Sequence, residues 1–418
     1  MTTRATTFTA LVSALIATAA LLLASPASAA SLVEVTGFGA NPGGMRMHVY
    51  VPDNRPAKPA IVVAMHGCGG SGPGFYSGSE FASLADRYGY VVIYPSAQQE
   101  AGFGKCFDTW SDAAKRRGGG SDPVSIVSMV TYVQQRYGGD PNRVFATGSS
   151  SGGMMTNHML AVYPDVFKAG AAFMGVPFNC FANAADYPPG GKCTNGTMNR
   201  TPQQWGDAVR QAYPGYTGPR PKMQLWHGTA DNLVPYSLLQ EEVDQWTSVF
   251  GLSQTPTSTD TPRPGWNRSR FSDKVEAYSI QGAGHSLPSA GMAAVALEFF
   301  GITGGSDPNP PVPGPCAVKA SVTAWNNGLT ERITITNTGT TAVNGWSLAF
   351  TLPGGQNIAG GWNAGYSPTS GQVTARNVSH NAVIAPNGSV EIGFQATHSG
   401  DAAAASSFSL NGSSCSNG

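Results

Sequence analysis

The chain has 418 residues, 41% of them hydrophobic, so it is long enough for two domains and can bury at least one substantial core. Lysine plus arginine and aspartate plus glutamate number 24 each, so no basic excess predicts binding to nucleic acid or to an anionic membrane. Charged residues make up only 11% of the chain, while glycine and proline number 53 and 30. This composition is typical of an exported, loop-rich protein with an uncharged partner.

Residues 1–29 have the pattern of a secretory signal peptide. Arg4 supplies a positive charge, "FTALVSALIATAALLLA" supplies an apolar core, and Ala27 and Ala29 have the spacing of a cleavage site. A membrane anchor is the alternative, but it would need about 20 apolar residues with retained flanks, and no later stretch qualifies. We therefore expect a mature chain that begins near Ala30 and is secreted as a soluble protein.

Between residues 30 and 302, apolar strand-like runs alternate with helical patterns. The expected strands contain "AIVVAMHG", "YVVIYPS", "RVFATG", "KAGAAFMG", "KMQLWHG" and "VEAYSI". The expected helices contain "SEFASLADRYG", "PVSIVSMVTYVQQRYG", "SGGMMTNHMLAVYP" and "AGMAAVALEFFG". Nearly continuous apolar strands between helices indicate a parallel sheet that is covered on both faces. The sequence therefore predicts a doubly wound α/β domain.

The sequence changes character after residue 302. The run "GITGGSDPNPPVPGP" has no apolar periodicity and enough proline for an extended path, so residues 303–315 are interpreted as a linker. Residues 316–418 are rich in threonine, serine, asparagine and glycine, with short alternating runs such as "ERITITNT" and "SVEIGFQA". These spacings predict a small all-β domain, an antiparallel sandwich of about 100 residues.

Six cysteines in an exported chain favour disulfides over free thiols; they are Cys68, Cys106, Cys180, Cys193, Cys316 and Cys415. The domain division separates the last two from the other four, for which three connectivities remain. Proximity favours Cys180 with Cys193, which leaves Cys68 with Cys106. The sequence holds no Cys-x-x-Cys or His-x-x-x-His cluster, so we expect no metal ion.

The segment "RVFATGSSSGGMMTNHM" contains a candidate nucleophile. Gly148, Ser150 and Gly152 form Gly-x-Ser-x-Gly between an expected strand and an expected helix, which is the setting of a nucleophile elbow. Small residues are needed at 148 and 152 because the turn is so sharp that the neighbours of the serine nearly touch. The alternative is an ordinary loop, since this pattern arises often by chance in a chain rich in glycine and serine.

A serine nucleophile needs a histidine base and an acid, which in this fold follow it in the order acid, then histidine. His158 lies about two helical turns after Ser150 and is interpreted as a packing or surface residue. His227 ends a strand and is assigned a structural role in the turn that leads to Asp231. His285 lies in "QGAGHSLP", where glycines allow its side chain to reach across the edge of the sheet.

Asp231 and His285 both follow strands at their carboxyl ends, where active sites of open α/β sheets assemble. Alone, Asp231 could be an Asx-turn residue and His285 an exposed loop residue. Their joint occurrence in the required order predicts a triad in which Ser150 attacks, His285 acts as base and Asp231 orients it.

The transition state also needs donors for the developing oxyanion. One is expected from the backbone N–H of Ser151, at the positive end of a helix dipole. The other is expected from the Cys68 N–H in "MHGCGGSG", where glycines let the backbone bend inward. Cys68 could instead be only half of a disulfide, and the two roles are compatible. His66 is expected to brace this loop.

At this point the first domain resembles a known family. The motifs "MHGCGGSG", "GSSSGG", "LWHGTAD" and "GAGH", with "TPQQWGD" and "YPGYTGPRP", are similar to those of carbohydrate esterase family 1, in particular its acetylxylan esterases, which are akin to polyhydroxybutyrate depolymerases and feruloyl esterases. The resemblance covers roughly residues 31–302. It implies an α/β-hydrolase fold, the same triad, and no metal or organic cofactor.

Residues 316 to 415 resemble a family 2 carbohydrate-binding module. The resemblance implies a disulfide between its terminal cysteines and exposed aromatic rings that stack on sugars, here Trp325 and Trp362. His380 stands where a third tryptophan is common, while Trp346 alternates with apolar neighbours and is expected in the core. Gly328 offers no side chain to prop the Trp325 indole upright, which by analogy favours a flat platform for cellulose.

These patterns together predict a secreted, monomeric esterase that removes acetyl groups from xylan while its second domain holds it on cellulose. A feruloyl esterase is the nearest alternative, and a polyhydroxyalkanoate depolymerase is the next. A non-catalytic wall-binding protein is the least favoured, because the candidate triad is complete. The segment from Val176 to Pro221 has no assigned role beyond a rim over the site.

Overall fold

The structure of the chain is a computed structural model that describes residues 30–101, 104–181, 183, 186, 191–195, 197–198, 200–303, 316–399, 402–411 and 413–417. The predicted signal peptide and residues 304–315 of the predicted linker lie outside the described residues. Within them, the helices are all too short or too polar to cross a membrane.

Six apolar strands form the parallel centre of the N-terminal sheet, in the spatial order β4-β3-β7-β8-β9-β12. Most of their side chains are buried on both faces of the sheet, which explains why these sequences show little polar alternation. The strands are β3 (Ile61–Met65), β4 (Val91–Ser96), β7 (Val144–Ser149), β8 (Ala169–Phe173), β9 (Lys222–Gly228) and β12 (Val275–Ile280). The predicted doubly wound α/β core is confirmed.

Antiparallel pairing adds two strands at each end, so among the described residues the sheet is mixed and has ten strands. The predicted parallel sheet therefore corresponds to the centre, and the antiparallel edge strands are an addition that the sequence analysis did not foresee. Antiparallel edge strands tolerate an exposed face, and sequences such as "STDTPR" lack the apolar run by which the central strands were recognised. These strands are β1 (Val33–Val35), β2 (Arg46–Tyr50), β10 (Ser258–Arg263) and β11 (Trp266–Phe271), and a separate short hairpin joins β5 (Gln99–Glu100) to β6 (Lys105–Cys106).

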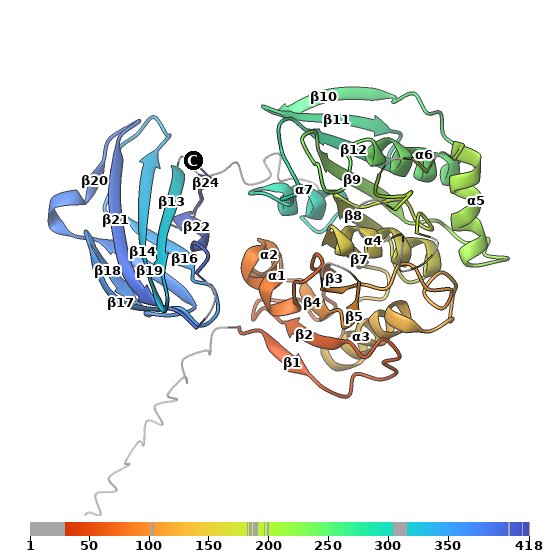
Figure 1. Cartoon of the computed structure of the whole chain (residues 1–418), viewed down its shortest axis with the longest axis horizontal. Helices are drawn as coiled ribbons and strands as arrows, with labels where there is room; N and C mark the ends of the chain where they lie inside the picture. The colour runs from red at the N-terminus through yellow and green to blue at the C-terminus, as the bar shows by residue number, and fades with distance from the viewer. Residues whose placement is uncertain are drawn as a thin grey trace, which may run out of the picture.

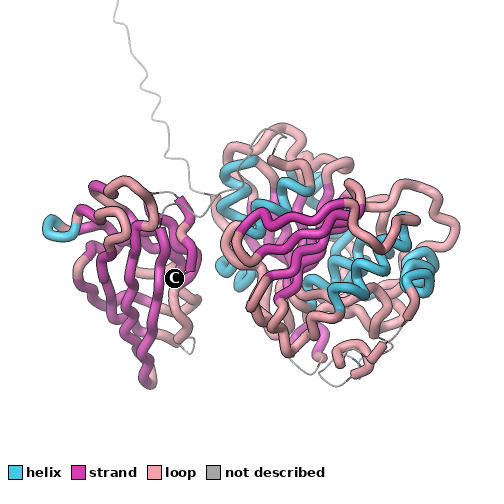
Figure 2. Tube along the Cα trace, turned by 90° about the horizontal axis from the view of Figure 1, so that it is seen from above, coloured by secondary structure: helices cyan, strands magenta, loops and turns pink. Residues whose placement is uncertain are grey.

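Helices cover both faces of this sheet, as Figures 1 and 2 show. Alternate residues of β3 divide between the two layers, with Ile61, Val63 and Met65 on one side and Val62 and Ala64 on the other. The first layer packs against α3 (Ser121–Tyr137), α4 (Ser151–Val162), α5 (Pro202–Ala212) and α6 (Leu238–Phe250). The second packs against α1 (Gly72–Gly78), α2 (Phe81–Tyr88) and α7 (Met292–Phe299).

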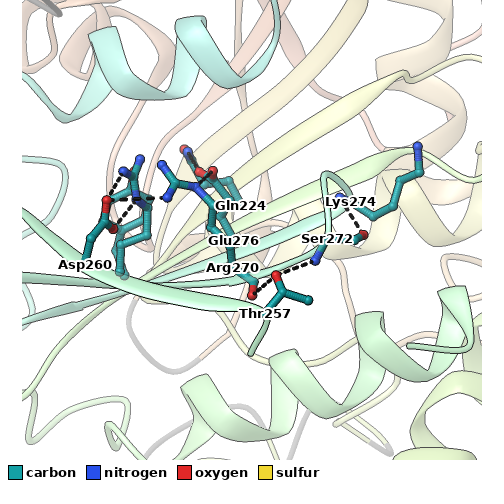
Figure 3. A network of polar contacts seen from close by, with 9 residues as sticks. Gln224, Thr257, Asp260, Arg270, Ser272, Lys274 and Glu276 are labelled. Atoms are coloured by element: carbon teal, nitrogen blue, oxygen red, sulfur yellow. Dashed lines mark hydrogen bonds and ion pairs between the residues drawn. The ribbon is translucent and has the colours of Figure 1, made fainter. Parts of the chain in front are cut away.

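A polar network crosses the end of the sheet that carries β9 and β12 (Figure 3). Arg270 of β11 contacts Asp260 of β10 at 3.4 Å and donates to Glu276 of β12 at 3.0 Å. Glu276 in turn accepts from the side-chain amide of Gln224 on β9 at 2.9 Å. These contacts link the four adjacent strands β9, β12, β11 and β10. They therefore help to hold β9, which leads to Asp231, against β12, which leads to His285.

The C-terminal domain is a β-sandwich, which confirms the all-β prediction. Its two five-stranded sheets have the orders β17-β21-β14-β13-β24 and β18-β19-β16-β22-β23, with a two-stranded pair β15-β20 beside them. Trp346 lies in the core and is 2% exposed, as expected. The elements are β13 (Cys316–Trp325), β14 (Gly328–Asn337), β15 (Val343–Asn344), β16 (Ser347–Thr351), β17 (Asn357–Trp362), β18 (Ala364–Ser367), β19 (Gln372–Asn377), η2 (Ser379–Asn381), β20 (Val383–Ile384), β21 (Ser389–Thr397), β22 (Ser406–Leu410), β23 (Ser413–Ser414) and β24 (Ser416–Asn417).

Three disulfides join the six cysteines, as Cys68–Cys106, Cys180–Cys193 and Cys316–Cys415. These are the pairs that proximity and the domain division favoured. The first two lie in the α/β domain. The third ties the beginning of the sandwich to its end, across a sequence separation of 99 residues.

Candidate active site

Ser150 lies in a sharp turn between β7 and α4. Its backbone has φ 53° and ψ −116°, a conformation that few residues other than glycine adopt. Its N–H donates to the carbonyl of Phe173 on β8 at 2.8 Å, which fixes the turn against the neighbouring strand. A Cβ on Gly148 would lie 2.5 Å from the carbonyl carbon of Gly152, so larger residues cannot fit there. The motif therefore forms the predicted elbow.

The structure brings the three predicted triad side chains together. The Ser150 hydroxyl donates to His285 Nε2, with the two atoms 2.8 Å apart. His285 Nδ1 donates to Asp231 Oδ2 at 2.7 Å, which leaves Nε2 as the acceptor in the neutral ring. A histidine placed this way can take the serine proton while the carboxylate holds its tautomer.

Asp231 is a buried carboxylate, and its side chain has no exposed area. Its Oδ1 accepts the backbone N–H groups of Leu233 and Val234, each at 3.0 Å. Burial raises the pKa of Asp231, but hydrogen bonds from His227, His285 and the Val234 backbone outweigh burial and lower that pKa well below its usual value. Asp231 is therefore ionised at neutral pH and can stabilise an imidazolium.

The loops that carry Asp231 and His285 are bonded directly to each other. The Ala230 N–H donates to the carbonyl of Ala283 at 2.9 Å, and the Gly282 N–H donates to Thr229 Oγ1 at 2.8 Å. A Cβ on Gly228 would lie 2.7 Å from the carbonyl carbon of Ala283, so only glycine permits this approach. The loops of Asp231 and His285 are thus held together at the ends of two adjacent strands.

The loop after β3 lies beside Ser150. A Cβ on Gly67 would be 3.4 Å from the Cβ of Ser150, which is ordinary contact distance. His66 braces this loop: its Nε2 accepts the Ala97 N–H at 3.1 Å, so its Nδ1 must donate to the Gly67 carbonyl at 2.6 Å. Burial lowers the pKa of His66 to about 4, so the ring stays neutral in this role.

The two residues predicted to supply oxyanion donors, Ser151 and Cys68, are each held by a contact with residues 106–107. Ser151 Oγ accepts the backbone N–H of Phe107 at 2.9 Å, and this hydroxyl is buried. Cys68 is joined by its disulfide to Cys106, the residue before Phe107. Residues 106–107 therefore connect the beginning of α4 to the loop after β3, which are the two segments beside Ser150.

The other two candidate histidines do not contact Ser150 in the described structure. His158 is buried on α4, with its ring centroid 4.6 Å from that of Phe178, as its interpretation as a packing residue predicted. Burial lowers its pKa to about 3. His227 is also buried, but it contacts Asp231 as well as the turn, at 3.4 Å from Oδ2. Sequence analysis missed this contact, although the i, i+4 spacing in "HGTAD" was visible.

Sequence analysis also missed a buried polar contact of Glu242 on α6, whose side chain is fully buried. Its Oε1 accepts the side-chain amide of Asn157 on α4 at 2.6 Å, and Asn157 Oδ1 accepts the Trp246 indole N–H at 2.7 Å. These bonds tie the nucleophile helix to the helix that follows the acid loop. Burial raises the pKa of Glu242 to about 8, so the carboxyl is neutral near pH 7.

In the C-terminal domain, two predicted sugar-stacking residues lie on the outer face of one sheet. Trp325 on β13 pairs with Gly328, and Trp362 on β17 pairs with Gly393. A Cβ on Gly328 would lie 2.7 Å from the indole of Trp325, and a Cβ on Gly393 would clash with the ring of Trp362. Both rings therefore lie over glycines. Trp325 is 49% exposed, and Trp362 is half-buried.

His380 is exposed, in the η2 turn. The next residue, Asn381, donates its side-chain amide to the carbonyl of Asn363 at 2.7 Å, which holds the turn beside the end of β17. The turn that carries His380 is therefore attached to the residue after Trp362. Across the described residues of both domains, no group of three or more histidine, cysteine or acidic side chains could hold a metal ion.

Comparisons with known proteins agree with this geometry. Residues 47–188 match the family described as "Esterase PHB depolymerase", and residues 316–415 match the family described as "Cellulose binding domain". A feruloyl esterase B from Talaromyces stipitatus is 48% identical over 282 residues, which cover 66% of this chain and 77% of that protein. The chain therefore belongs to the same esterase family as this relative.

Two further members carry a different name. An acetylxylan esterase from Coprinopsis cinerea is 47% identical over 279 residues, covering 66% of this chain and 74% of that protein. The solved structure of an acetyl xylan esterase from Aspergillus awamori is 39% identical, covers 65% of this chain and 99% of that one, and has a TM-score of 0.61. The N-terminal domain is thus a carboxylic ester hydrolase of the α/β-hydrolase type.

Replacing Ser151 by alanine should lower kcat about 10-fold, because the buried Phe107 N–H loses its acceptor and the brace between α4 and residues 106–107 loosens. Steady-state kinetics on a soluble acetyl ester measure this. Thr147→Val is the matched control, since it removes a buried hydroxyl that bonds to Ala171 within the sheet. Both variants should be less stable, but only Ser151→Ala should lose kcat, and an unchanged kcat would contradict the account.

Replacing Glu242 by glutamine should change how stability depends on pH. The folded pKa of Glu242, about 8, lies above its unfolded value of 4.5, so the wild type loses stability as pH rises through this window, on the order of 5 kcal/mol in total. Glutamine cannot ionise, so the variant should escape that loss. Denaturant unfolding at pH 5 and pH 9 compares the two, with exposed Glu298→Gln as control. Equal pH dependence in variant and wild type would contradict the assignment.

Proposed function

We propose that this chain is a secreted esterase that removes acetyl groups from xylan and is held on cellulose by its C-terminal domain. The observation that carries the proposal is the hydrogen-bonded chain from Ser150 through His285 to Asp231, with distances of 2.8 and 2.7 Å. Relatives named acetylxylan esterase at 47% and 39% identity support the choice of substrate. The match to the cellulose-binding family supports the choice of surface.

The proposed reaction has two steps. In the first, Ser150 Oγ bonds to the acetyl carbon while its proton passes to His285 Nε2, and the proton then moves to the departing sugar oxygen as the ester bond breaks. In the second, His285 takes a proton from water, whose oxygen attacks the acetyl-serine, and acetate leaves as Ser150 regains its proton. Asp231 stabilises the imidazolium in both steps.

The backbone N–H groups of Cys68 and Ser151 are proposed to bind the oxyanion of the tetrahedral intermediates. Support comes from the contact of the Gly67 loop with Ser150 and from the position of Ser151 at the first residue of α4, where the helix dipole is positive. The brace through residues 106–107 would hold both donors at a fixed separation. No metal or organic cofactor is required.

The C-terminal domain is proposed to bind cellulose through Trp325 and Trp362, with His380 at the border of the platform. Two indoles that lie over glycines on the outer face of one sheet can stack on sugar rings. Binding would raise the concentration of the esterase near hemicellulose on the same fibre. The proposed limits are 30–302 for the esterase domain, 303–315 for the linker and 316–418 for the binding module, in a monomer exported by residues 1–29.

Cleavage of feruloyl esters is the second candidate function. It is favoured by the relative from Talaromyces stipitatus, which is named feruloyl esterase B and is 48% identical. The same triad would serve either ester, because the acyl group changes and the reaction does not. A polyester depolymerase fits the family description "Esterase PHB depolymerase" but fits a sugar-binding module poorly.

Replacing Ser150 by alanine should lower kcat for soluble acetyl esters at least about 10⁴-fold, because the nucleophile is gone, and should leave cellulose retention unchanged. The converse variant, Trp325→Ala with Trp362→Ala, should lose cellulose retention and keep its turnover. Ester hydrolysis and pull-down on microcrystalline cellulose measure both. Wild-type turnover in Ser150→Ala, or full retention in the tryptophan variant, would contradict the corresponding assignment.

Acetate and ferulate released from plant-wall xylan should distinguish the two esterase candidates. We expect the wild-type enzyme to release acetate at least 10 times faster than ferulate, each measured by chromatography at equal ester concentration. The Ser150→Ala protein is the control for spontaneous hydrolysis. Faster release of ferulate would reverse the order of the two functions.

A further inference from the structure

His227 occupies a position in the acid loop that the proposed reaction does not use. It lies near the end of β9, four residues before Asp231, and both side chains are completely buried. Its Nε2 is 2.9 Å from the carbonyl oxygen of Val234 and 3.4 Å from Asp231 Oδ2. It therefore contacts both ends of the turn that presents the carboxylate to His285.

The tautomer of His227 follows from these partners. A carbonyl oxygen and a carboxylate oxygen both accept hydrogen bonds, so Nε2 must carry the proton and share it between them. The other ring nitrogen, Nδ1, is buried and has no hydrogen-bond partner among the residues that the structure describes. The two acceptors beside Nε2 therefore fix the direction in which the ring donates.

The contact completes the shell of donors around Asp231. Oδ1 accepts from the backbone N–H groups of Leu233 and Val234, and Oδ2 accepts from His285 Nδ1. The N–H of His227 is the fourth donor, so each carboxylate oxygen has two. A carboxylate can accept about four hydrogen bonds, and with all of them made it has no alternative rotamer of equal energy.

Loss of the His227 N–H would weaken the orientation of His285, the proposed base. Without His227, one lone pair of a fully buried anion is unsatisfied, and the Val234 carbonyl that shares the same N–H loses its partner. The carboxylate would then gain freedom to turn from His285, and a base with a poorly held tautomer accepts the serine proton less often. The hydrogen bond from His227 also helps to lower the pKa of Asp231, as expected for a donor that stabilises the ionised carboxylate.

We propose that His227 is a positioning residue for the esterase reaction, acting through its Nε2–H to hold the Asp231 carboxylate and the Val234 carbonyl in the geometry that orients His285. The proposal rests on the proposed catalytic role of Asp231. His227 touches neither Ser150 nor, since it has no exposed area, the substrate. Its removal should therefore lower kcat and leave KM nearly unchanged.

Two amide variants of the full chain test the position of the donor. His227→Gln places an N–H donor where Nε2 stands, and His227→Asn places the same group near Nδ1, one methylene short. We expect kcat on a soluble acetyl ester to fall at least 10-fold in His227→Asn and less than 3-fold in His227→Gln, with KM within 2-fold in both. Equal kcat values in the two variants would overturn the proposal.

The same pair is then made in the Asp231→Asn protein, to separate positioning from simple support of the fold. If His227 acts through the carboxylate, both substitutions should change the residual kcat less than 2-fold in this background. A loss that persists undiminished would show a role independent of Asp231 and would overturn the proposal. If Asp231→Asn alone keeps wild-type kcat, the proposed triad fails instead.

A measurement on the wild-type protein covers the case in which neither variant folds. Nitrogen-15 NMR of histidine-labelled enzyme should show the proton of the His227 ring on Nε2 and not on Nδ1. That ring is assigned to His227 by its coupling to the neighbouring residues of β9. Observation of the Nδ1–H tautomer would overturn the proposal.

Discussion

The structure depends most on a buried carboxylate that must be both ionised and immobile. Asp231 has no exposed side-chain area, and its charge is tolerated because hydrogen bonds to it replace water. Those donors come from its own turn, from His227 and from His285, so the histidine loop supplies part of what stabilises the buried charge. The order of β9 and β12 in the sheet, adjacent and parallel, makes that meeting possible.

Other parts of the α/β domain hold Ser150 in place opposite His285. Ser150 is held in a strained turn by glycines that let β3, β7 and α4 approach closely, and residues 106–107 brace the beginning of that helix against the disulfide-linked loop. Glu242 ties α4 to α6 through Asn157. The β-sandwich has a separate core and a separate disulfide, so binding to a surface and hydrolysis can be changed independently.

The central strands, and the meeting of Ser150, His285 and Asp231, could be predicted from sequence because each depends on a local signal. The signal is a continuous apolar run, or a residue type at the carboxyl end of such a run. The edge strands lacked that signal because they are polar on an exposed face. The sequence also held a signal for the start of helix α5 that the analysis overlooked, because Thr201 and Gln204 form a capping box there. Glu242 contacts Asn157, which lies 85 residues away in the chain, and no single-sequence pattern reports such a pair. The contact of His227 with Asp231 had a visible signal in its i, i+4 spacing, but that spacing alone does not say which partner a buried histidine takes.

The central claim is that Ser150 is the nucleophile and that its reactivity comes from His285. Inactivation by a fluorophosphonate, followed by peptide mass spectrometry, tests this most directly. The account predicts one phosphonyl group per chain, attached to Ser150, formed at a rate that falls with the loss of ester hydrolysis when His285 is replaced by alanine. Complete inactivation with the group on another residue, or labelling of Ser150 at an undiminished rate in His285→Ala, would contradict it.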